Sequence, residues 1–441
     1  MTRWLFAPHA LTARGWARGL RLAVDAGRVV ALEGSPAEGA TPQPGDALLG
    51  GALLPGVSNA HSHSFQRAIA GRTERRARGE NHFWSWREQM YAAALRMSPE
   101  EVGRVAGAVA RECKAAGYTS LCEFHYLHHA PSGERYEDLG ELSRRVIDAA
   151  RGEGLAVTHL PVLYRWSGFG RRAPLEEQRR FVCDLDEYAR LVEGLRAAYA
   201  GDPLVRIGLA PHSLRAVSPD DLRALVDLWR ALGPAETPVH IHISEQRAEV
   251  EGCVESLGAR PVEWLLANAP VDARWTLVHA THVTPSEREG MRRAGAVACL
   301  CPTTEANLGD GLFQVPEWLE GGGALAIGSD SNVTVSVVEE LRLLEYGQRL
   351  TRERRNVCPP LLEGAGEAWT GATLWRAAAE GGGRASGRVG GLCVGDVADF
   401  VVLDGAEAAA WGLSPEEQVE AWVFGGRGGV AEVWVGGVRV L

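Results

Sequence analysis

The sequence predicts an α/β protein: a (β/α)8 TIM barrel with a small β-sandwich domain built from both chain termini. Eight short apolar runs alternate with longer helical stretches along the middle of the chain, which is typical of a closed parallel sheet. Short strand-like runs with glycine turns occur at both ends instead, and 441 residues leave room for both parts. We therefore expect residues 1–54 and 385–441 to form the sandwich, and residues 55–384 to form the barrel.

The eight apolar runs are the expected barrel strands, at residues 53–60, 119–124, 155–163, 204–210, 238–244, 275–280, 296–301 and 324–329. Between and after them the periodicity predicts helices at residues 99–116, 136–151, 175–199, 219–232, 260–268, 285–294 and 335–350. Ser98 and Ser218 each precede a proline at the start of such a segment, which is typical of a helix N-cap. Further strands, of the sandwich, are expected at residues 20–24, 29–32, 398–404 and 431–437.

Charge and cysteine content restrict the class of protein. The 46 basic and 56 acidic residues give a net charge of −10 without a basic run, so we expect no nucleic-acid partner. The sequence has no uncharged run of about 20 apolar residues and no apolar signal segment at its N-terminus, so we expect no membrane association. The eight cysteines form no CxxC pair, which is typical of reduced thiols in a cytoplasmic protein.

Four potential metal ligands stand where predicted strands end. His61 and His63 follow the first strand, and extended backbone turns residues i and i+2 to the same side. His242 lies late in the fifth strand, and Asp330 directly follows the eighth. Because the C-terminal ends of the strands form the active-site face of such a barrel, we expect these side chains to meet. Three imidazoles and one carboxylate, with room left for water, are typical of a catalytic zinc site.

The number of metal ions and the roles of their neighbours depend on three further residues. His279 ends the sixth strand and is either a fifth ligand or a group that orients the water. Two-metal sites in similar barrels need a bridging anion, often a carboxylated lysine, and Lys114, the single lysine, lies inside a helical segment. We therefore favour one metal ion with His279 beside it. Glu245 either shuttles a proton to a leaving group or is a helix-start acid that interacts with the dipole.

Longer motifs surround these residues. They cover residues 59–68, 83–88, 123–126, 212–217, 303–311 and 328–331, together with the fifth and sixth strands. With these motifs the chain resembles the amidohydrolase superfamily and, within it, the formimidoylglutamate deiminases of histidine degradation. The resemblance implies a homodimeric hydrolase with one zinc ion per subunit, held by His61, His63, His242 and Asp330. It also implies the hydrolytic deamination of N-formimino-L-glutamate to N-formyl-L-glutamate and ammonia.

The same resemblance assigns the remaining site residues. The substrate pocket would be lined by Gln66, Arg87, Tyr126, His212 and Arg215. Asp330 would accept the proton of the attacking water and His279 would orient that water, while Glu245, aided by His212, would protonate the departing nitrogen. The substrate is a small molecule with two carboxylates, and the planar forks of Arg87 and Arg215 suit bidentate carboxylate binding.

Two other functions fit parts of the pattern. A deaminase of the same superfamily that acts on a purine, pterin or related ring would have the same ligands but an aromatic pocket without a carboxylate clamp. A catalytically silent barrel that serves as a scaffold would be expected to have lost metal ligands, whereas this chain has the whole set.

Overall fold

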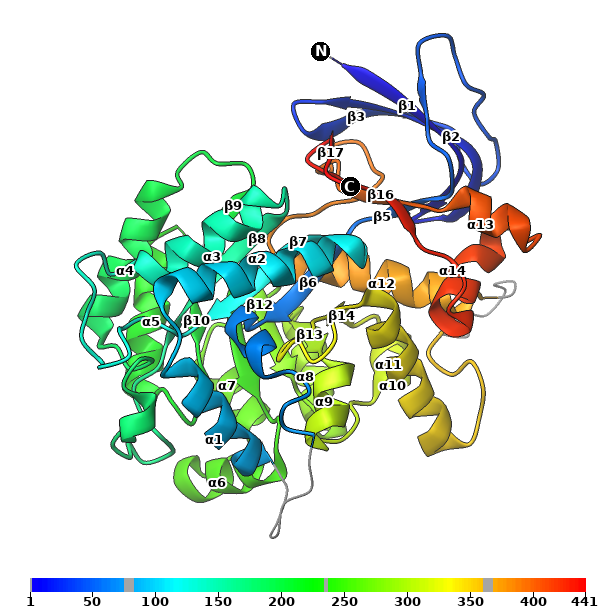
Figure 1. The fold of residues 1–441 in the computed structure, drawn as a ribbon. Coiled ribbons are helices and arrows are strands. Elements are labelled where there is room, and N and C mark those ends of the chain that lie inside the picture. The colour runs from blue at the N-terminus through cyan, green and yellow to red at the C-terminus, as the bar shows by residue number, and fades with distance from the viewer. Residues whose placement is uncertain (1, 75–82, 234–236, 360–367) are drawn as a thin grey trace.

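The computed structural model describes residues 2–74, 83–233, 237–359 and 368–441. Figure 1 shows a barrel surrounded by helices and a smaller sheet that carries both termini. This architecture confirms the fold class predicted from the sequence, a (β/α)8 barrel with an added sheet domain from both chain ends. The division of the chain near residues 54 and 385 stays a prediction.

Parallel strands form the barrel wall and confirm the eight predicted positions. They are β6 (Val57–Ser62), β7 (Tyr118–His125), β8 (Ala156–Leu163), β9 (Val205–Ile207) followed by β10 (Ala210–Pro211), β11 (Val239–Ile243), β12 (Trp275–His279), β13 (Val297–Leu300) and β14 (Ala324–Ile327). They pair in two arcs, from β6 to β10 and from β11 to β14. Parallel bridges between Leu209 and Val239, and between Ser62 and Asp330, close the two arcs into one ring.

Helices follow the strands and surround the barrel (Figure 1). They are η1 (Ser64–Ile69), α1 (Phe83–Ala94), α2 (Pro99–Ala115), α3 (Glu141–Gly152), η2 (Glu176–Gln178), α4 (Leu185–Ala198), α5 (Pro219–Ala231), α6 (Arg247–Leu257), α7 (Pro261–Asn268), α8 (Pro285–Ala294), α9 (Pro302–Leu308), α10 (Val315–Glu320), α11 (Val337–Arg352) and α12 (Thr370–Ala385). Ser98 and Ser218 cap α2 and α5 as predicted, each accepting a backbone N–H three residues on. Within the described ranges, no helix has both the length and the apolar character needed to cross a membrane.

The outer sheet combines both ends of the chain. Its strands are β1 (Arg3–Thr12), β2 (Gly15–Asp25), β3 (Arg28–Glu33), β4 (Ala47–Leu48), β5 (Leu53–Pro55), β15 (Phe400–Leu403), β16 (Val430–Val435) and β17 (Val438–Arg439), with α13 (Gly405–Ala410) and α14 (Pro415–Gly425) between β15 and β16. The order across the sheet is β17-β16-β15-β5-β1-β2-β3, and β4 pairs with β1. Phe400 and Trp434 stack at 5.3 Å between ring centroids in its buried core, so strands from the C-terminal segment complete a sheet begun by the N-terminal one.

The first predicted strand divides at Gly56 into two strands of different sheets. β5 pairs with β1 and β15 of the outer sheet, whereas β6 pairs with β7 of the barrel. The Gly56 N–H donates to the Asp399 carbonyl at 3.0 Å. A β-carbon at Gly56 would lie 2.6 Å from Thr119 Oγ1 and 2.9 Å from the Asp399 oxygen. Glycine is therefore required where one apolar run of the sequence passes between two sheets.

Replacing Gly56 with alanine is expected to lower the free energy of unfolding by about 1–3 kcal/mol, because the added methyl group would overlap Thr119 and the Asp399 backbone. Urea unfolding curves measure this change. The matched control is Gly50→Ala, since nothing lies within 4 Å of a β-carbon there. Equal stabilities of the two variants would contradict the close approach at Gly56.

The helix predicted at residues 175–199 is interrupted, and η2 and α4 are separate. Between them Arg180 is buried, and its guanidinium donates to the His129 carbonyl at 2.7 Å, to the carbonyl of Ala94 at the end of α1 and to the carbonyl of Met97 in the segment after α1. Asp184 then caps the first turn of α4. The sequence periodicity did not predict this break because the partners of Arg180 are distant along the chain.

The end of α12 packs against the N-terminal ends of the barrel strands. A β-carbon at Gly381 would overlap the Leu325 carbonyl, so this helix lies directly on strand backbone. His240 Nε2 donates to the Ala385 carbonyl at 2.8 Å, and Thr158 Oγ1 donates to the Ser386 carbonyl at 2.8 Å. With this end of the barrel filled, the candidate site lies at the opposite ends of the strands.

Candidate metal centre and substrate pocket

Four side chains from β6, β11 and the turns after β6 and β14 converge at the C-terminal ends of the strands. His61 Nε2 lies 3.2 Å from His63 Nε2 and 2.9 Å from His242 Nε2. Asp330 Oδ1 lies 3.5 Å from His61 Nε2 and 3.2 Å from His63 Nε2. All four side chains are buried, and one donor atom from each lies within 4.8 Å of the others. The structure thus brings together the four residues predicted as metal ligands, which we call the four-donor group.

The hydrogen bonds of two imidazoles turn Nε2 lone pairs toward the centre of this group. His63 Nδ1 donates to the Phe124 carbonyl at 2.8 Å, and His242 Nδ1 donates to the His212 carbonyl at 3.1 Å. Each Nε2 is then unprotonated, and lone pairs this close repel each other unless a cation lies between them. Ligand atoms at about 2.0–2.1 Å from a tetrahedral ion are about 3.3 Å apart, close to the observed spacing. The donor set therefore fits a divalent metal ion.

A network of buried amide and hydroxyl groups fixes the turn that carries Asp330. Asn332 Nδ2 donates to the Asp330 carbonyl at 3.1 Å and to the His63 carbonyl at 3.0 Å. Asn332 Oδ1 accepts from Ser329 Oγ at 2.6 Å. Asp330 and Asn332 have φ values of 46° and 56°, the left-handed region that costs energy for residues other than glycine. These contacts with the β6 end hold the strained turn so that Asp330 faces the two histidines.

His279 lies beside the four-donor group. Its Nε2 is 3.7 Å from Asp330 Oδ2 and 3.9 Å from Glu245 Oε1, while its Nδ1 donates to Glu305 Oε1 at 3.2 Å. Burial lowers the pKa of His279, but the three carboxylates outweigh burial and raise that pKa well above its usual value. His279 is therefore a cationic donor aimed at Asp330 and Glu245. Lys114 lies within α2 and bonds elsewhere, so it offers no bridging anion here.

Glu245 follows β11 and faces the same centre. Its Oε2 lies 3.5 Å from Arg215 Nη2, and its other oxygen faces His279 rather than the first N–H groups of α6. Burial raises the pKa of Glu245, although His279 and Arg215 oppose that rise. A carboxyl group with a raised pKa beside the metal centre can hold and release a proton, which favours the proton-shuttle interpretation over the helix-start one.

Replacing Glu305 with glutamine is expected to lower kcat about 10- to 100-fold with unchanged metal content, because the charge that orients and protonates His279 is lost. Ammonia release and metal analysis measure the two effects. Glu340→Gln is the matched control, since Glu340 is a buried carboxylate that instead accepts from Thr303. A Glu305 variant with the kcat of the Glu340 variant would exclude this positioning role.

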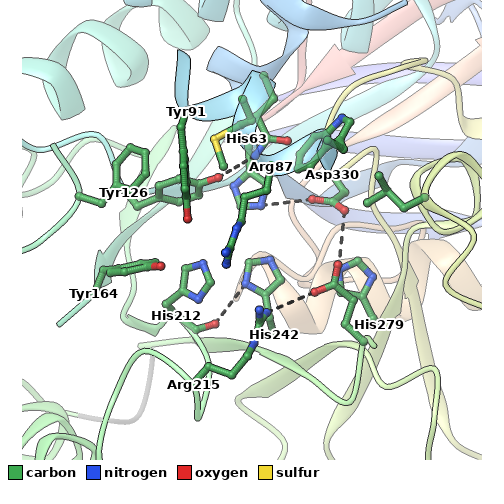
Figure 2. Close-up of a pocket in the computed structure, with 16 residues that line it drawn as sticks. His63, Arg87, Tyr91, Tyr126, Tyr164, His212, Arg215, His242, His279 and Asp330 are labelled. Carbon is green, nitrogen blue, oxygen red and sulfur yellow. Dashed lines mark hydrogen bonds and ion pairs between the residues drawn. The ribbon is translucent and has the colours of Figure 1, made fainter. Parts of the chain in front are cut away.

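One cavity joins three members of the four-donor group, His63, His242 and Asp330, to every residue predicted to bind substrate (Figure 2). It is lined by His63, Gln66, Trp86, Arg87, Met90, Tyr91, Tyr126, Tyr164, Phe181, His212, Arg215, His242, Glu245, His279, Leu308 and Asp330. Gln66 Nε2 donates to the Tyr126 hydroxyl at 2.6 Å. Burial and the charge of Arg215 lower the pKa of His212, which is therefore neutral. The roles of the five predicted residues stay predictions, but all five meet in one place.

Several residues of the site were not predicted. Glu305 follows β13 and Tyr164 follows β8, so the same strand-end rule that found the metal ligands could have found both. Tyr91 lies on α1, where nothing in the local pattern separates a pocket residue from an ordinary helix residue. Phe181 comes from the irregular segment after η2.

A closed barrel with three imidazoles and a carboxylate at its strand ends defines a metal-dependent hydrolase. The chain belongs to the amidohydrolase family, which it matches over residues 52–440. Residues 2–49 match a second family, described as formimidoylglutamate deiminase HutF, N-terminal domain.

Three similar proteins illustrate this membership. The formimidoylglutamate deiminase of Pseudomonas aeruginosa is 46% identical over 441 residues, covering 99% of this chain and 94% of that protein. The 8-oxoguanine deaminase of the same organism is 27% identical over 82% of this chain and 79% of its own length. The crystal structure of an amidohydrolase from Brucella melitensis superposes with a TM-score of 0.91 at 44% identity, covering 99% of this chain and 94% of that one.

Proposed function

We propose that this protein is a formimidoylglutamate deiminase, which hydrolyses N-formimino-L-glutamate to N-formyl-L-glutamate and ammonia in histidine degradation. The observation that carries the proposal is that Arg87 and Arg215 line the same cavity as His63, His242 and Asp330 of the four-donor group (Figure 2). Two guanidinium groups suit a substrate with two carboxylates. The relative of that name in Pseudomonas aeruginosa matches nearly the whole chain, which supports the same activity here.

The reaction begins with water at the four-donor group. A divalent metal ion bound there supplies Lewis acidity that lowers the pKa of a water molecule. Asp330 Oδ2, the oxygen that faces His279, accepts the proton of the attacking water. His279, held as a donor by Glu305, orients that water through its Nε2–H.

The reaction ends with the loss of ammonia. Addition of water to the formimino carbon gives a tetrahedral carbon that carries a hydroxyl group and two nitrogens. Glu245, aided by neutral His212 in the pocket wall, delivers a proton to the nitrogen that departs as ammonia. The hydroxyl loses its proton and becomes the formyl oxygen. One water is consumed and one ammonia is released.

The proposal includes one zinc ion per subunit, a homodimer and a cytoplasmic location. Three imidazoles and one carboxylate suit zinc, whose sites commonly combine these ligands with an open position. All eight cysteines are free thiols and seven are buried, which agrees with a reducing compartment. The homodimer rests on the resemblance to the formimidoylglutamate deiminases.

Ammonia release tests the proposal. Turnover should be fastest with N-formimino-L-glutamate, measured against N-formimino-L-aspartate, guanine and cytosine. A chelator should abolish it and added zinc should restore it. Absence of ammonia from N-formimino-L-glutamate with metal-loaded protein, or faster release from either ring, would overturn the proposed function.

A further inference from the structure

Gln178 joins two tyrosines of the pocket wall. Its Nε2 donates to the Tyr91 hydroxyl oxygen at 2.9 Å and to the Tyr164 hydroxyl oxygen at 2.8 Å. Gln178 is fully buried, and its Oε1 accepts the Leu175 N–H at 2.8 Å, which fixes which end of the amide carries the hydrogens. The three side chains come from α1, from the end of β8 and from η2, so the amide ties together three separate segments.

The hydrogen-bond inventory of this group leaves a donor for the pocket. Both amide hydrogens of Gln178 are used, so both phenol oxygens act as acceptors toward it. A hydrogen bond between the Tyr91 and Tyr164 hydroxyls would occupy one of the two phenol protons at most. Among the residues that the structure describes, no carboxylate or carbonyl accepts a hydrogen bond from the remaining phenol O–H. At least one O–H is therefore available to a ligand in the cavity that both tyrosines line.

The surroundings of the two hydroxyls favour an anionic ligand. Burial raises the pKa of Tyr164, while Arg215 and Arg87 act in the opposite direction, so both guanidinium groups lie near this hydroxyl. The phenol is protonated at neutral pH and donates. In Figure 2, Tyr91 and Tyr164 lie on one side of the pocket, and Asp330 and His279 lie on the other.

The position of the two tyrosine hydroxyls relative to the reacting centre indicates which part of the substrate they contact. The formimino carbon must lie beside Asp330 and His279, and Arg215 contacts Glu245 of the same centre. The tyrosine hydroxyls are on the opposite wall (Figure 2). The substrate group farthest from the formimino carbon is the side-chain carboxylate, which follows three carbons after the nitrogen.

We propose that Tyr91 and Tyr164 form a hydroxyl subsite for the side-chain carboxylate of the substrate, with Gln178 as the residue that positions both. This inference rests on the proposed function. The subsite adds neutral hydrogen-bond donors to the charged guanidinium groups. Removing such a donor costs more binding free energy when its acceptor is a carboxylate than when its acceptor is an amide.

Kinetics of Tyr91→Phe, Tyr164→Phe and the double variant test the subsite with two substrates, N-formimino-L-glutamate and N-formimino-L-glutamine. We expect each single variant to raise KM for the glutamate substrate by up to about tenfold and the double variant by more, with little change in kcat. The preference for glutamate over glutamine should fall in parallel. Gln178→Met should give the same pattern to a smaller extent, because it removes the amide and leaves both phenols.

Tyr188→Phe is the matched control. Its hydroxyl is also buried, but it donates to the Pro161 carbonyl outside the pocket, so its loss should lower Tm and leave KM unchanged. The Kd of the product N-formyl-L-glutamate, measured by calorimetry without turnover, should rank the variants in the same order as KM does. An unchanged KM and product Kd in the double variant, or equal losses for both substrates, would overturn the subsite. Failure of the wild type to release ammonia would instead overturn the proposed function.

Discussion

Asp330→Asn is expected to give a folded protein that retains about one thousandth of the wild-type kcat or less. Asparagine has the shape of aspartate and keeps an oxygen near His61 and His63, so the turn held by Asn332 should form. It cannot accept the proton of water. Burial raises the pKa of Asp330, but the neighbouring His61, His63 and His279 outweigh burial and hold that pKa well below its usual value, so the wild-type carboxylate is ionised at neutral pH.

The measurements are kcat for ammonia release, metal content and the free energy of unfolding. Asp399→Asn is the matched control, because Asp399, directly before β15 of the outer sheet, is a buried carboxylate that accepts from Arg388 at 2.6 and 3.1 Å. We expect the control to lose stability and keep kcat, and Asp330→Asn to show the reverse. A metal-loaded Asp330 variant with near-normal kcat would exclude its role in proton transfer.

The fold was predictable where the pattern is local. The eight barrel strands are short apolar runs, and each observed strand overlaps a predicted one. Two segments that were predicted as single elements are divided in the structure, and tertiary contacts cause both divisions. The run at 53–60 divides because Gly56 meets Asp399 more than 300 residues away in the chain, and the helix at 175–199 breaks because Arg180 is buried against distant carbonyls. Neither partner is visible in the local sequence.

The site was predictable where it depends on strand register. His61, His63, His242 and Asp330 stand at the ends of β6, β11 and β14, so one topological rule predicts that they meet. The wall formed by Tyr91, Tyr164 and Gln178 was not predicted, because it depends on how α1 and η2 fold over the mouth of the barrel. Loop conformation of this kind has no periodicity from which it could be inferred.

Arg215→Met is expected to lower kcat/KM for N-formimino-L-glutamate by about 10²–10³-fold. The guanidinium is nearly buried and lies 3.5 Å from Glu245, so without it a substrate carboxylate would be buried beside an enzyme carboxylate with no cation between them. Leaving one partner of a buried ion pair costs about 3–5 kcal/mol. Arg215→Lys should lose less, because it keeps the charge and loses only the planar fork.

The Arg215→Met variant also separates the proposed function from that of a ring deaminase, such as the 8-oxoguanine deaminase to which the chain is 27% identical. A purine or pterin ring has no carboxylate, so ring turnover would not need the guanidinium as a clamp. The matched control is Arg274→Lys, since Arg274 pairs with Asp272 and lies 4.4 Å from the Trp229 ring, outside the pocket. If Arg215→Met left kcat/KM at the level of this control, the carboxylate clamp would be removed from the mechanism, and with it the reason to prefer a linear dicarboxylate over a ring.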